Sequence, residues 1–343
     1  MKFKRRQQIY LIFSICLLAA ACKNKKEVDV SHIQVNLSIE RFDKELSALS
    51  PAHVSVKAPQ LKQKYGHFYA DFMESILGVG SVTDTAYYTQ LRSVLSNKDY
   101  KELAAEVNRT FPDLQDQEEE LTDAFKHIRY YYPKTKLPRV ITFFSGFSVQ
   151  TPVGNDYIGI GLDMFLGLTS RFYPALVQSI PQYISRRFTP ENITPRVIEG
   201  LIREDIFPDQ DKDRSLLAKM VYNGKILYMM DAVMPDIADS LKIGYTSEQM
   251  EWAATYQPEV WAYFLQNNLL YEADYMKIQK YLTDAPFTPG IGQDSKSAPK
   301  LGVYTGWQIV KRYMERNPDS TLQQLMEESD PQKILNGSKY KPR

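Results

Sequence analysis

The sequence predicts a mainly α-helical α+β fold in which a small β-sheet is packed with helices. Apolar residues recur every three or four positions over most of the chain, which is the spacing of one helix face. Two short apolar runs, at residues 140–144 and 157–162, are instead rich in strand-forming residues. With 343 residues, 43% of them hydrophobic, the chain can bury a substantial core. The length suits one large domain or two modest ones. We expect a single domain because no shift in composition marks a boundary.

The first half of the chain is predicted to be helical. Apolar residues between positions 61 and 77 fall on one face of a helix, and Gly78 is a typical stop signal. The residues on this face are Tyr65, Phe68, Phe72 and Ile76. The same spacing predicts further helices over residues 85–95, 99–110 and 113–132.

Two buried strands follow. Residues 140–144 lie between Pro138 and Gly146, and a short apolar run with such boundaries favours a strand over a helix. Residues 157–162 have the same character and come after the turn residues 154–156. We expect the two runs to form adjacent strands.

Helices return in the second half of the chain. Pro195 is a first-turn signal for a helix that ends before Pro208. A second amphipathic helix spans residues 215–231, and we expect it to be interrupted or kinked at Gly224. Further helices are predicted over residues 247–256, 259–267, 271–282, 304–317 and 322–328.

The N-terminus predicts an export signal. Four positive charges precede the apolar run 9–21, and small residues lead directly into Cys22. This run is shorter than the roughly 20 residues that span a bilayer, which disfavours a permanent transmembrane helix. We predict a signal peptide at 1–21, a lipidated Cys22 opening a polar tether over 22–30, and a single domain at 31–343. Acyl chains such as palmitate would provide a stable anchor. Ordinary cleavage to a soluble secreted protein is the alternative.

Composition and motifs exclude several function classes. Forty-two basic against 41 acidic residues leave a formal charge of +1, so nothing favours nucleic acid as a partner. Both cysteines fall within the first 22 residues, where they cannot staple the fold. Gly159 and Gly161 lack the third glycine of a dinucleotide fingerprint, and we interpret them as a close backbone approach. The sequence also contains no nucleophile-elbow or phosphate-loop motif.

Several strings in one order carry a family resemblance. They are the lipobox ending at Cys22 and residues 156–167, 180–184, 222–225 and 302–310. Together they resemble the gliding-motility lipoprotein GldB family of Bacteroidetes over nearly the whole mature chain. The resemblance implies a lipoprotein of the cell envelope that is needed for gliding. Its implied partners are the membrane, through the lipid, and proteins of the gliding and type IX secretion machinery.

The start of the tether bears on which side of the membrane the protein faces. It is basic, whereas surface-exported lipoproteins of that phylum tend to carry an acidic cluster after the cysteine. We therefore expect a periplasm-facing position, with the inner and the outer membrane both open. The basic residues are Lys23, Lys25 and Lys26.

The resemblance also implies a degenerate peptidase frame. GldB-like proteins resemble zincin peptidases, in which a helix bearing H-E-x-x-H supplies zinc ligands. Here Glu199 keeps the glutamate, but Ile198 and Ile202 replace both histidines, and Asn223 stands where a later glutamate is common. Isoleucine offers no ligand atom. We therefore expect a zincin-like fold with no metal and no cofactor, and a non-enzymatic accessory role.

Carboxylates near the expected cleft leave a chemical alternative open. Glu199 and Asp231 would serve a cryptic hydrolase if burial drew their pKa values apart. The more ordinary interpretation is helix capping and solvated helix faces. A third hypothesis, a periplasmic module that binds peptide or cell-wall glycan, rests on the 23 tyrosines. The other carboxylates of this region are Asp163, Glu204 and Asp205.

Overall fold

The computed structural model describes residues 28–292 and 296–343 of the chain. Contacts separate residues 1–33 from a compact unit formed by residues 34–343, and the described helices and strands belong to the second unit. The predicted signal peptide and Cys22 lie outside the described residues. The predicted domain organisation therefore stays a prediction.

A small parallel sheet forms the middle of the larger unit. Its three strands are β1 (Ile39–Glu40), β2 (Arg139–Phe143) and β3 (Tyr157–Gly161), in the order β1-β2-β3. Val140 of β2 stands opposite Ile39 of β1 and Ile158 of β3. Both predicted strands are confirmed. Strand β1 was not predicted, because two residues are too few to show an alternating pattern.

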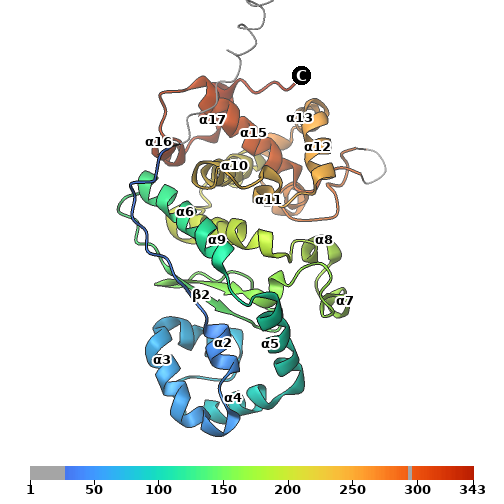
Figure 1. Cartoon of the computed structure of the whole chain (residues 1–343). Helices are drawn as coiled ribbons and strands as arrows, with labels where there is room; N and C mark the ends of the chain where they lie inside the picture. Colours follow the sequence, from blue (N-terminus) through green and yellow to red (C-terminus); the bar gives the residue numbers. More distant parts are fainter. Residues whose placement is uncertain (1–27, 293–295) are drawn as a thin grey trace, which may run out of the picture. The chain divides into compact units, whose positions relative to one another are not determined.

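Helices cover both faces of this sheet (Figure 1). Val140 and Ile158 belong to the larger apolar core, together with side chains of α5, α6 and α9. Ile141 and Phe143 face the smaller core, which α2, α3 and α4 complete. Burial on both faces explains why the strands are continuous apolar runs. The bounds are α2 (Phe42–Ser47), α3 (Val54–Asp71), α4 (Tyr87–Ser96), α5 (Lys98–Thr110), α6 (Gln115–Tyr131) and α9 (Ile193–Leu201).

Aromatic rings fill the smaller core. Phe42 meets the rings of Tyr65, Phe68 and Phe72 edge-on, with centroid distances of 4.9, 5.1 and 5.0 Å. Such edge-to-face pairs stabilise a core beyond the area that they bury. The predicted face of helix 61–77 is therefore confirmed as core. The helix begins earlier than predicted, at Val54, is kinked at Gly66, where φ is 54°, and ends in a π-helical turn.

The larger core is built around two long helices, α10 (Leu216–Val233) and α15 (Leu301–Arg316). They cross at backbone contact, since a Cβ on Gly306 would lie 1.8 Å from the carbonyl oxygen of Met220. A Cβ on Gly224 would likewise lie 2.3 Å from the carbonyl oxygen of Gly306. The predicted interruption at Gly224 is wrong, because α10 runs through it as one helix. The lack of a side chain at Gly224 instead allows the backbone of α15 to pack directly against α10.

The remaining elements are shorter. The predicted helix 271–282 is reduced to α14 (Tyr275–Ile278) and a 3₁₀ turn, whereas α17 (Pro331–Ser338) was not predicted. The other α-helices are α7 (Tyr173–Leu176), α8 (Gln182–Ser185), α11 (Asp239–Ile243), α12 (Ser247–Thr255), α13 (Gln257–Gln266) and α16 (Leu322–Glu327). The 3₁₀ turns are η1 (Pro51–His53), η3 (Leu162–Phe165), η4 (Pro190–Asn192), η6 (Leu269–Tyr271) and η7 (Gln279–Tyr281). The π-helical turns are η2 (Phe72–Ile76) and η5 (Ile202–Ile206).

Both edges of the sheet are occupied. Along β3, the N–H groups of Gly159 and Gly161 donate to the carbonyl oxygens of Pro152 and Gln150, both at 2.8 Å. A Cβ on Gly161 would lie 2.3 Å from a backbone oxygen of this segment, which confirms the predicted close approach. At the opposite edge, the N–H of Ile39 donates to the Glu118 carboxylate at 2.9 Å.

Candidate functional site

Helix α9 presents Glu199 on its polar side and two isoleucines on its buried side. Ile198 and Ile202 have no exposed surface and belong to the larger core. Glu199 forms ion pairs with Arg196, one turn before it, and with Arg203, one turn after it, the latter at 3.0 Å. Carboxylate–guanidinium pairs are among the stronger charged hydrogen bonds in proteins. The two arginines therefore occupy both oxygens of the predicted candidate carboxylate.

Arg203 also joins Glu199 to the second predicted position. Its Nη2 donates to the Asn223 Oδ1 at 2.9 Å, and the Asn223 Nδ2 donates to the backbone oxygen of Lys219 at 2.8 Å. The structure thus brings Glu199 and Asn223 together through one guanidinium. Ile198 and Ile202 are directed into the core instead. Sequence analysis missed Arg196 and Arg203, although spacings of three and four residues on a helix are a usable signal.

Further charges lie near this pair, and one of them, Lys300, is buried. Asp284 binds Lys300 at 2.9 Å and Arg187 at 2.8 Å. Burial alone would raise the pKa of Glu199, but the positive charges of Arg196, Arg203 and Lys300 outweigh it and lower the pKa to about 2. A carboxyl group with this pKa stays ionised at neutral pH. It therefore cannot donate a proton as a general acid.

Asp231 belongs to a different network. It binds Lys242 at 3.1 Å and Lys311 at 3.3 Å, and it accepts the indole N–H of Trp307 at 2.9 Å. The Lys311 ammonium also lies 3.7 Å from the Trp307 ring centre. In the described part of the chain, none of these three groups bonds to Glu199. The structure thus does not join the two candidate carboxylates in one site.

Asp163 organises the loop after β2. Its Oδ2 accepts the backbone N–H groups of Ser145 at 3.0 Å and of Phe147 at 2.6 Å. The side chain is fully buried, and this burial raises its pKa to about 6. These bonds hold Phe147 at a φ of 69°, a backbone conformation that is uncommon outside glycine. The other two carboxylates, Glu204 and Asp205, are exposed on the π-helical turn η5.

A cavity of about 610 Å³ lies beside the Glu199 cluster, which consists of Glu199, Arg196 and Arg203. It opens between residues 206–213, α10 and the connection from α16 to α17. Phe207 and Tyr222 stack there with ring centres 5.6 Å apart. Arg203 lies over Tyr222 at 5.7 Å, and Lys225 lies over Phe207 at 5.4 Å. This cation–ring series connects the Glu199 cluster to the cavity.

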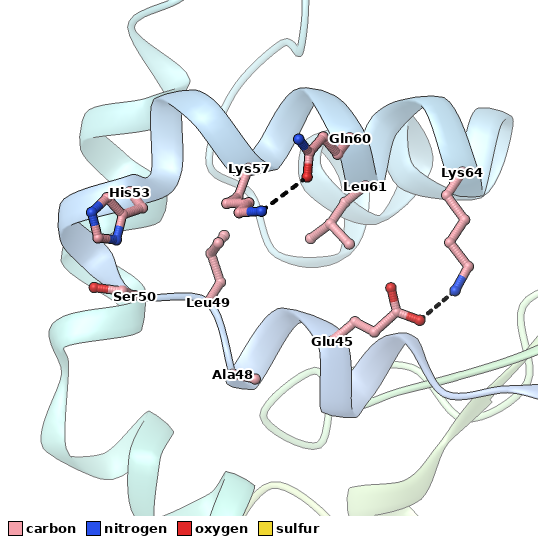
Figure 2. Close-up of a pocket in the computed structure, with 9 residues that line it drawn as sticks. All are labelled: Glu45, Ala48, Leu49, Ser50, His53, Lys57, Gln60, Leu61 and Lys64. Atoms are coloured by element: carbon pink, nitrogen blue, oxygen red, sulfur yellow. Dashed lines mark hydrogen bonds and ion pairs between the residues drawn. The ribbon is translucent and has the colours of Figure 1, made fainter.

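A second cavity, of about 550 Å³, lies between α2 and α3 (Figure 2). Leu49 and Leu61 form its apolar part. Its polar side chains are mostly exposed and in part bind one another: Lys57 donates to Gln60 at 3.4 Å, and Lys64 pairs with Glu45. The imidazole of His53, which also lines the cavity, has no hydrogen-bond or ion-pair partner among the described residues. We assign no chemical function to this open cavity.

The fold and the site define a mainly helical α+β protein whose central carboxylate is held in ion pairs. In the described residues, no helix combines the length and the apolar character needed to cross a bilayer. The model of the family described as "Gliding motility protein GldB" matches residues 23–342, and the chain belongs to that family. The predicted membership is confirmed, and it relates the chain to gliding motility, to lipoproteins and to the cell envelope. Comparisons with curated proteins and with solved structures gave no match.

Proposed function

We propose that this chain is a lipid-anchored, periplasm-facing and non-enzymatic accessory of the gliding machinery and the type IX secretion apparatus. Family membership supports the link to gliding, and the lipobox at Cys22 supports the anchor. The observation that carries the non-enzymatic part is the state of Glu199. Both of its carboxylate oxygens are bonded to arginines, which leaves neither free to act as a general base, and its pKa of about 2 argues against a role as a general acid.

The same region supports a degenerate zincin-like frame as part of this proposal. Ile198 and Ile202 stand at the two positions that a peptidase would give to metal-binding histidines, and both side chains are core residues. Asn223 is held by Arg203. In this interpretation a guanidinium links the remaining polar positions, and the helix serves as a structural element.

A complementation experiment tests the proposal. The gene is deleted and replaced by wild type, Glu199→Gln or the matched control Glu251→Gln, which changes an exposed glutamate on α12. Protein levels are matched before colony spreading and the secretion of type IX cargo are measured. We expect the deletion to abolish both, and both variants to restore them fully.

Two outcomes would contradict it. If a folded Glu199→Gln variant fails while Glu251→Gln succeeds, the carboxylate has an active or binding role. If the deletion spreads and secretes normally, the accessory function itself is wrong.

A further inference from the structure

The cavity beside Phe207 and Tyr222 has the dimensions of a ligand site. Its volume of about 610 Å³ falls within the roughly 300–1,000 Å³ of typical small-ligand pockets. The π-helical turn η5 ends on its wall at Ile206. Turns of this kind are rare and recur at functional sites.

Lys225 is the most unusual group of this cavity. Its side chain is 4% exposed, and its ammonium donates to the backbone oxygens of Met326, at 3.3 Å, and of Glu328. An ammonium has three N–H donors, so one remains without an acceptor among the described residues. None of the described carboxylates forms an ion pair with it. Burial lowers its pKa to about 8, although the nearby charge of Glu328 acts in the opposite direction.

A second donor and an apolar wall accompany Lys225. Tyr132 lines the same cavity, and its hydroxyl has no hydrogen-bond partner among the described residues. An ammonium and a phenol are both donors to a carboxylate. Ile206, Val221 and Met326 provide aliphatic surface next to them. The cavity is thus lined by two donors that can bind an anion and by aliphatic side chains that can contact an apolar group.

The rim carries the opposite charge. Five carboxylates line the cavity, against three lysines that include Lys225. Asp209 and Asp211 both bind Lys219, whereas the exposed Glu327 forms no ion pair in the described part of the chain. A highly negative ligand would be repelled here, but a cationic group beside the bound anion would be attracted.

We propose that this cavity binds the carboxyl end of a peptide chain with an apolar last residue and a basic residue shortly before it. The terminal carboxylate accepts hydrogen bonds from Lys225 and Tyr132, the last side chain lies against Ile206 and Met326, and the basic residue meets the acidic rim. This inference rests on the proposed function, because it names the kind of partner that an accessory protein would bind.

Fluorescence anisotropy tests the proposal on the purified full chain in detergent. The probe is a fluorescein-labelled pentapeptide that contains two lysines and ends in leucine with a free carboxylate. Its control ends in the corresponding amide. We expect saturable binding of the acid, at least about tenfold tighter than that of the amide, because the amide lacks the charge that Lys225 pairs with.

Three variants locate the site. Ala218→Phe puts a large side chain into the cavity and leaves Lys225 in the sequence, and we expect it to weaken binding of the acid at least tenfold. Lys225→Met should remove the difference between acid and amide, with folding checked by circular dichroism. Lys101→Met, the same change at an exposed lysine of α5, should bind like wild type.

The proposal is overturned if the acid shows no saturable binding up to millimolar concentration, if acid and amide bind alike, or if Ala218→Phe binds like wild type. The Ala218→Phe result decides the matter if Lys225→Met does not fold. If the peptide-binding proposal fails, the results expected for colony spreading and cargo secretion do not change. The failure of this proposal can therefore be told apart from a failure of the proposed accessory function.

Discussion

The crossing of α10 and α15 provides a sharp test of the packing. Replacing Gly306 by alanine puts a methyl group 1.8 Å from the backbone oxygen of Met220, where ordinary contacts are 3.4–4 Å. The obstacle is backbone, so no side-chain rotation can relieve it. The two helices have to separate by more than an ångström along the contact that holds the larger core together.

The expected magnitude follows from two opposing effects. Alanine in place of glycine favours a helix by about 0.5–1 kcal/mol. Overpacking of a close-packed core costs about 1–3 kcal/mol, and rigid backbone places this site at the upper end. Separation would also loosen contacts around Trp307, which is fully buried. We expect a net loss of about 2 kcal/mol in the free energy of unfolding.

A second helical glycine supplies the control. Around Gly200 in α9, the nearest atom to an added Cβ is the Thr151 hydroxyl oxygen at 3.7 Å, an ordinary contact. Gly200→Ala should therefore stabilise the protein by about 0.5–1 kcal/mol. Urea unfolding followed by circular dichroism measures both variants. If Gly306→Ala is as stable as wild type, the described crossing is wrong.

Three further predictions concern charge and anchoring. The pKa of Glu199, about 2 in the fold against an ordinary 4.5, stabilises the protein above pH 4.5, and this contribution of at most about 3 kcal/mol disappears as the pH falls to 2. Wild type should thus lose more unfolding free energy over this range than Glu199→Gln; parallel pH curves would refute the ion-pair assignment. Trp307→Phe removes the hydrogen bond to Asp231 and should cost about 1–3 kcal/mol, so an unchanged urea midpoint would contradict that bond. Cys22→Ala should abolish labelling by radioactive palmitate, and persistent label would sink the lipobox assignment.

Local patterns predicted most of the regular structure, and what they missed depends on distant contacts. The long helices follow from periodicity, and the strands at 140–144 and 157–162 follow from short apolar runs of strand-forming residues between turn residues. Strand β1 exists only because Ile39 and Glu40 pair with β2, about a hundred residues away. Gly224 has the same local signal whether it marks a kink or a close approach. Only its contact with Gly306 decides between them.

The candidate site shows the same division. Glu199 was identified through the resemblance to the zincin helix, and its arginine partners lie within one turn on either side. Lys225 lies in one of the strings that carried the family resemblance, yet nothing in that string shows that it is buried. The carbonyl groups that bind it, of Met326 and Glu328, come from a helix end about a hundred residues further along. The spacing of residues within one segment cannot predict a contact between residues so far apart in the sequence.

The occupied edges of the sheet restrict how this protein can meet other chains. A bare strand edge is a template on which foreign strands add, either as a means of recognition or as the start of aggregation. Here the N–H groups of Gly159 and Gly161 are already bonded within the chain, and Glu118 caps the amide of Ile39. In a crowded cell envelope, neither edge of the sheet is therefore a ready template for the addition of a foreign strand. A partner strand would have to displace these bonds before it could pair with the described sheet.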